Sequence, residues 1–151
     1  MRRNAFIIVV MCVLAALQTP ACTLKASHNY EADSESYAYV GEAIPAIFGS
    51  WDSEALLKRV SPEYLKSTNS EQTKRFFADA SAIFGPMKAY HDLKGSATDI
   101  YDSTGNPKQI TLFTANLDFL KRPATLRLQL SKADDNWQID GWHVDVRADN
   151  S

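Results

Sequence analysis

The spacing of hydrophobic residues changes once along this chain, at Pro86. Between residues 34 and 84, apolar side chains recur at every third or fourth position, which is the period of an amphipathic helix. After Pro86 they alternate with polar side chains, which is the period of a β-strand. The pattern therefore predicts helices in the first part of the domain and strands in the second.

The longest helical pattern covers residues 34–51. Ser34 is its candidate N-cap, and Pro45 inside it predicts a kink, because proline has no N–H and its ring clashes with the preceding turn. One face of this helix is apolar and should point to the core: Tyr37, Val40, Ile44, Ile47, Phe48 and Trp51.

Three shorter helices are predicted after it. Their candidate N-caps, in chain order, are Asp52 or Ser53, Ser61, and Asn69 or Ser70. Pro62 is suited to the first position of the second of these helices. Gly85 and Pro86 should end the last one, since glycine closes a helix readily and proline cannot continue it.

The second part of the chain predicts an antiparallel sheet. Four strands are expected over residues 87–101, 109–120, 124–131 and 134–147. The alternation is clearest in the third strand, where every second residue is leucine. Gly95 is predicted to mark a bulge or bend in the first strand, because glycine weakens a regular strand.

The last strand carries its apolar residues out of phase. Trp137 and Ile139 are odd-numbered, whereas Trp142 and Val144 are even-numbered, so a regular strand cannot keep both pairs on one face. One extra residue at Asp140 or Gly141 restores the phase, which is the effect of a β-bulge. Asp140, His143 and Asp145 would then point away from the core. Valine in place of Gly141 is expected to distort this bulge and destabilise the domain.

These elements predict one α+β domain over residues 34–148. Its 151-residue chain with 45% hydrophobic residues is long enough for a single core. The N-terminal helices would pack on a curved four-stranded antiparallel meander. Because bulges bend the sheet, helices on its concave side would give a cone-shaped molecule.

The first 21 residues resemble a secretory signal peptide instead of a part of the fold. Two arginines precede an uncharged apolar run over residues 5–17, and small residues follow it. The run is shorter than the roughly 20 residues that span a bilayer. We therefore expect an exported protein.

Cys22 is then the one cysteine left in the exported chain, because Cys12 lies in the signal peptide. An unpaired thiol in an oxidising compartment requires an explanation. Ala21-Cys22 after an apolar run resembles a bacterial lipoprotein processing site, where the cysteine is acylated. The alternative is an ordinary signal-peptidase cut, which would give a soluble periplasmic protein. Residues 22–33 are polar and predict a tether to the domain.

The charge pattern argues against nucleic-acid binding. The formal net charge is −2, and no cluster of Lys and Arg occurs beyond the N-terminus. A protein that binds the phosphate backbone needs such a basic patch. Contact with a membrane is expected only through a lipid anchor.

The chain resembles the nuclear-transport-factor-two-like (cystatin-like) superfamily, and within it small secreted bacterial domains without assigned function. The resemblance rests on the order of elements, on "FGSWD" after the first helix, on "FGPMKAYHDLKG" and on "DDNWQIDGWHVD". It implies the cone-shaped fold over residues 34–147. It implies no single activity, since this fold hosts enzymes, ligand binders and interaction modules.

Few residues suit catalysis. The resemblance implies that an enzyme of this fold would carry an Asp or a His-Asp pair inside the cone, with a Tyr or Arg donor. Asp118 alternates away from the core, and His91 is expected at the rim or surface, although a position inside the cone stays open. The three histidines, His28, His91 and His143, are too far apart to predict a metal site, and no cofactor motif is recognisable.

Aromatic side chains could line a pocket for an apolar ligand, although such residues also build ordinary cores. The candidate lining residues are Tyr37, Trp51, Phe76, Tyr90, His91, Phe113 and Trp142.

The sequence favours a non-enzymatic cell-envelope protein that binds a small ligand or a protein partner. One alternative is a small isomerase, dehydratase or hydrolase that uses a His or Asp in the cone. Another is a module that self-associates, as a homodimer, through the polar outward face of strands 109–120 and 124–131.

Overall fold

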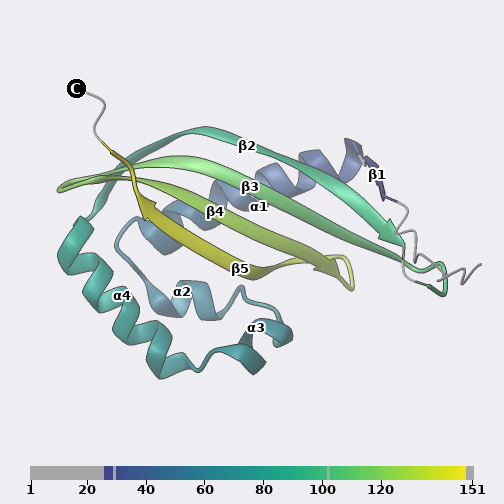
Figure 1. Cartoon of the computed structure of the whole chain (residues 1–151), viewed down its shortest axis with the longest axis horizontal. Coiled ribbons are helices and arrows are strands. Elements are labelled where there is room, and N and C mark those ends of the chain that lie inside the picture. Colours follow the sequence, from purple (N-terminus) through teal and green to yellow (C-terminus); the bar gives the residue numbers. More distant parts are fainter. Residues whose placement is uncertain (1–25, 29, 102, 149–151) are drawn as a thin grey trace, which may run out of the picture.

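The computed structural model describes residues 26–28, 30–101 and 103–148 (Figure 1). The predicted signal peptide and Cys22 lie outside these residues. Within the described part of the chain, no helix is long and apolar enough to cross a membrane.

Four helices precede the main strands, as predicted. They are α1 (Tyr30–Phe48), α2 (Ser53–Leu57), α3 (Pro62–Ser67) and α4 (Ser70–Phe84). The predicted N-caps of α2, α3 and α4 are confirmed, because each side chain accepts a hydrogen bond from a backbone N–H: Asp52 from Ala55 at 3.0 Å, Ser61 from Tyr64 at 3.2 Å and Asn69 from Gln72 at 2.7 Å. The first helix begins at Tyr30, four residues before the predicted Ser34.

The strands form one antiparallel sheet in the order β1-β2-β3-β4-β5, so the α+β class is confirmed. Their bounds are β1 (Ala26–His28), β2 (Met87–Tyr101), β3 (Pro107–Phe119), β4 (Pro123–Ala133) and β5 (Asn136–Val146). The short strand β1 was not predicted. It lies inside the segment expected to be a tether, and it pairs with the end of β2.

The bulge in β5 is confirmed. Gln129 on β4 pairs with Gly141, but the next residue, Leu130, pairs with Ile139, so Asp140 is the extra residue. The structure shows no steric need for glycine at position 141. Its φ is not positive, and an added Cβ would meet no atom within 4 Å, so the bulge does not depend on glycine.

The two irregularities in β2 lie before Gly95, not at it, and the first is between Met87 and Ala89. The register shifts between His91 and Lys94, and Asp92 adopts a φ of 54°. Asp tolerates this left-handed region better than most residues. Gly95 has a different role, because an added Cβ would overlap the Phe113 ring.

The core is rich in aromatic side chains. Trp51 stacks on Phe84 and Phe119, with ring centroids 5.5 and 5.0 Å away, and its Nε1 donates to the Gly85 carbonyl at 3.0 Å. In Figure 1, α1 crosses behind the strands, and α2, α3 and α4 lie on the β5 side of the sheet. Strand β5 is therefore the sheet edge that meets these helices.

Candidate functional site

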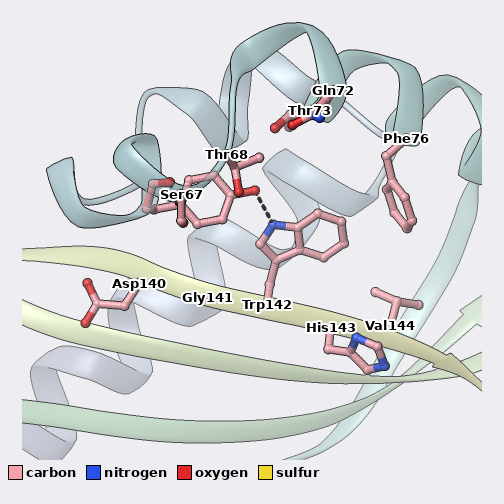
Figure 2. A pocket seen from close by; sticks show the side chains of 11 residues that line it. Ser67, Thr68, Gln72, Thr73, Phe76, Asp140, Gly141, Trp142, His143 and Val144 are labelled. Carbon is pink, nitrogen blue, oxygen red and sulfur yellow. Dashed lines mark hydrogen bonds between the residues drawn. The ribbon is translucent and has the colours of Figure 1, made fainter.

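An open cleft of about 540 Å³ lies between the α3–α4 hairpin and β5 (Figure 2). One wall comes from the helices and the other from the residues that follow the bulge. The lining consists of Tyr64, Ser67, Thr68, Gln72, Thr73, Phe76, Asp140, Gly141, Trp142, His143 and Val144.

Local capping builds the helical wall. The Ser61 cap and Pro62 fix the start of α3, and α3 ends after one and a half turns. Thr68 and Asn69 are extended and carry the chain to α4. Thr73, in the first turn of α4, is buried and donates its hydroxyl to the Asn69 carbonyl at 3.3 Å. These local bonds fix the turn between the two helices, and α3 contacts β5 directly.

Aromatic side chains form the centre of the cleft. Figure 2 shows Trp142 pointing toward the helices. Its Nε1 donates to the Tyr64 hydroxyl at 3.0 Å. The ring centroid of Trp142 lies 5.2 Å from that of Phe76 and 5.4 Å from that of Phe77. Phe77 is buried, whereas Phe76 keeps 47% of its surface exposed. Phe76 and Trp142 thus offer an apolar surface that the fold does not fill.

The charged residues of the lining are engaged elsewhere. Asp140 accepts a bond from the Ser131 hydroxyl at 2.9 Å, and Figure 2 shows its carboxylate directed away from Trp142. His143 lies 2.8 Å from a carboxylate oxygen of Asp145. The remaining polar groups of the lining are neutral hydroxyls and one amide. The cleft is therefore suited to a ligand with an apolar group and neutral polar atoms.

The residues that the sequence suggested as pocket lining lie in different parts of the structure. Trp142 and Phe76 line the cleft, whereas Trp51 belongs to the buried aromatic core. Tyr37 lies over β2, where its hydroxyl accepts from the N–H of Gly95 at 3.0 Å and donates to the carbonyl of the same residue at 3.1 Å.

The other three suggested residues also lie outside this cleft. The Phe113 side chain is buried on the core-facing side of β3 and packs edge-on against the Tyr37 ring. Tyr90 is half-buried against the core, and His91 is exposed on the opposite face of the sheet. Sequence reasoning missed Tyr64, Ser67 and Thr68, because their place in the wall depends on how the α3–α4 hairpin packs.

His91 belongs to a chain of polar contacts on the outer face of the sheet. Its Nδ1 lies 2.8 Å from Asp92 and its Nε2 lies 3.2 Å from Asp118, while Arg147 donates to Asp118 at 2.9 Å. Asn116 donates to Asp92 at 3.0 Å. The bond from His91, followed by that from Asn116, lowers the pKa of Asp92 below its usual value.

This outer chain of contacts is open to solvent. The side chains of His91, Asp92 and Asp118 are 47%, 57% and 40% exposed. Water screens their charges, whereas an acid–base group in an enzyme usually sits in a partly buried pocket. Among the described residues, no group of three or more His, Cys, Asp or Glu is arranged to hold a metal ion.

A second, smaller hollow of about 350 Å³ lies over the sheet, beside Leu112, Arg127, Gly141 and His143. Leu112, Gln129 and Gly141 form one cross-strand row. Leu112 is 64% exposed there, and Gly141 contributes no side chain. The exposed Leu112 side chain thus lies in the same row as the hollow at Gly141.

Comparisons with known proteins gave no match: no protein-family model, no curated protein and no solved structure is significantly similar to this chain. The cleft and the sequence pattern are therefore the basis for a function.

Proposed function

We propose that this chain is a non-enzymatic, exported protein of the bacterial cell envelope that binds a small ligand or a protein partner in the cleft between α3–α4 and β5. The signal-like residues 1–21 support export, and Cys22 is the proposed site of a lipid anchor. The anchor would hold the protein at a membrane, and without it the protein would be periplasmic.

We further propose that the domain has the nuclear-transport-factor-two-like fold, with the helices in the concave side of a bent sheet. The order of elements supports this assignment, as four helices precede the long antiparallel meander. The two register shifts in β2, between Met87 and Ala89 and between His91 and Lys94, and the bulge at Asp140 in β5 support the bend.

One observation carries the binding function. Phe76 and Trp142 are large aromatic side chains that remain partly exposed on opposite walls of a concave surface. Exposed aromatic groups in a cleft that also offers neutral hydrogen-bonding groups are typical of binding sites. The solvent-exposed His91 contacts favour this function over an enzyme that uses a pocket histidine or aspartate.

The binding function is tested by NMR with a library of small aromatic and aliphatic fragments added to the ¹⁵N-labelled full chain. The indole N–H signal of Trp142 should shift on binding, because this group lies in the cleft. Phe76→Gln should weaken the binding. Ile83→Gln is the matched control, since Ile83 lies on the same helix with 50% exposure and does not line the cleft. Binding that is unchanged in Phe76→Gln, or absent from the cleft, would contradict the proposal.

Export and anchoring are tested by intact-mass measurement of the protein recovered from bacterial membranes. A chain that starts at Cys22 and carries diacylglyceryl and acyl groups is the expected result for a lipoprotein. An unmodified chain in the soluble fraction would contradict the anchor and retain export. A full-length chain that still begins at Met1 would contradict both.

The outer face of the sheet supports a second candidate, a homodimer. The exposed Leu112 of one copy could enter the hollow above Gly141 of another copy, since both lie in one cross-strand row. Most of this face is polar, so the dimer should be modest in affinity. Light scattering over a concentration series should show a dimer that Leu112→Glu abolishes. A monomer at every concentration would exclude it.

A further inference from the structure

The edge of β5 that faces the cleft carries backbone groups that no other described element binds. Arg147 donates its N–H to the Pro123 carbonyl on β4 at 3.0 Å. Backbone groups of successive residues in an antiparallel strand point to opposite sides. With the regular pairing of residues 141–146, the N–H and C=O groups of Trp142, Val144 and Val146 therefore point away from β4. Among the described residues, no backbone hydrogen bond from another element reaches these three.

The molecule itself already adds a strand residue to this edge on the other side of the bulge. Ile139 donates its N–H to the Arg59 carbonyl at 2.8 Å and accepts from the Ser61 N–H at 2.9 Å. This is a parallel pairing of Val60 with Ile139. Pro62 then begins α3, and the chain leaves the edge. The edge is thus covered at Ile139 and open beyond Asp140.

The open part of the edge runs along the cleft. A strand added here would alternate its side chains between two sides, and one side would face the partly exposed rings of Phe76 and Trp142. The neutral groups of the wall, Ser67, Thr68 and Gln72, could bond its polar atoms. The Asp140 carboxylate keeps its charge but is directed away from Trp142, and His143 contacts Asp145, so the wall groups that flank Phe76 and Trp142 are neutral.

We propose that the partner bound in the cleft is an extended, uncharged peptide segment of another protein, which pairs with the backbone of Trp142–Val146 and packs a large apolar side chain against the exposed surfaces of Phe76 and Trp142. This inference rests on the proposed function and names its partner. The segment continues the intramolecular pairing of Arg59–Ser61 along the same edge. A second copy of this chain is disfavoured, because three free edge residues offer far less than the roughly 800 Å² per partner of a stable interface.

The test uses capped pentapeptides of sequence Thr-Phe-Thr-Val-Thr and the ¹⁵N-labelled full chain. The peptide should shift the Trp142 and Val144 amide signals and slow the hydrogen exchange of both amides. Two N-methylated forms separate backbone pairing from side-chain binding. One carries methyl groups on the amides of the second and fourth residues, and the other carries them on the first, third and fifth. Only one of these sets can face β5 in an added strand.

We expect one N-methylated form to lose affinity at least about tenfold and the other to lose less than about threefold. Equal affinity of all three peptides at the cleft would overturn strand pairing and would leave the proposed binding function intact. If none of the three peptides binds but small fragments still bind at Trp142, strand pairing would likewise be overturned and the binding function retained. Without peptide, the Val144 amide could instead become protected from hydrogen exchange as the protein concentration and the molecular mass in solution rise together. That result would overturn the proposal and indicate that a second copy of this chain occupies the edge.

A backbone variant adds an independent test. Val144→Pro removes one N–H that points away from β4, and proline is tolerated in an edge strand at such a position. The variant should keep the amide spectrum of the folded core and lose peptide binding at least about tenfold. Peptide binding at wild-type affinity in a folded Val144→Pro protein would contradict the pairing.

Discussion

The two halves of β5 belong to one strand but differ in what covers them. Before the bulge, Trp137 and Ile139 are buried, and Arg59–Ser61 pairs with the strand edge. After the bulge, Trp142 is only partly buried and Val146 is 55% exposed. Both halves direct apolar side chains toward the helices. The burial of an edge strand therefore depends on the segment beside it as well as on the alternation of its side chains.

The largest expected difference between the two halves is in stability. Ile139→Ala should lower the free energy of unfolding by about 2–5 kcal/mol, because Ile139 is fully buried and its truncation leaves a cavity. Val146→Ala should change it by less than about 0.5 kcal/mol, because Val146 is exposed. Urea unfolding followed by circular dichroism measures both. Equal losses would show that the two halves are equally packed and would contradict the comparison.

A smaller effect is expected where the open half contacts α3. Tyr64→Phe removes the acceptor of the Trp142 indole N–H and should cost about 1 kcal/mol of the free energy of unfolding. It should also move the indole signal of Trp142 in the NMR spectrum. Tyr101→Phe, at the far end of β2, is the control and should leave that signal in place. A Tyr64→Phe protein with an unchanged indole signal would contradict the bond.

The bulge that separates the halves should tolerate a side chain. Gly141→Val adds atoms in open space at a φ that other residues adopt, so the free energy of unfolding should change by less than about 0.5 kcal/mol. Gly95→Ala is the contrasting variant. It should cost about 1–3 kcal/mol, since its Cβ would overlap the Phe113 ring. A large loss of unfolding free energy in Gly141→Val would show that the bulge does require glycine at this position.

The smallest effect concerns pH and the outer face near the end of β5. The folded state lowers the pKa of Asp92, so it favours the ionised carboxylate. This contribution is present above the pKa of the unfolded chain and is lost as the pH falls through the lower folded value. Wild type should therefore lose slightly more stability than Asp92→Asn in this acidic range. Parallel acid-unfolding curves for the two proteins would contradict the shift.

Local patterns predicted most of the elements and little of the cleft. The caps at Asp52, Ser61 and Asn69 and the bulge in β5 depend on neighbours a few residues away, and the structure contains all of them. The position of Tyr64 beside Trp142 depends on packing between segments 78 residues apart. Periodicity carries no information on such a contact.

The two glycines in the sheet illustrate the same limit. Sequence reasoning gave Gly95 and Gly141 roles in bulges, because glycine is common there. In β2 the irregularity instead includes Asp92, which takes the left-handed conformation. Gly95 is required because the Phe113 ring comes close to it from the neighbouring strand. Which glycine is essential is decided by a neighbour that is distant in sequence.

The extra residue at Asp140 also bears on solubility. A long, flat and uncovered strand edge acts as a template on which further chains stack into fibrils. The bulge divides the edge of β5 into two short runs, and Arg59–Ser61 already occupies the first of them. The remaining run carries a charged neighbour at Asp145 and ends at Arg147. The irregularity that directs both tryptophans inward thus also protects the protein against aggregation along this edge.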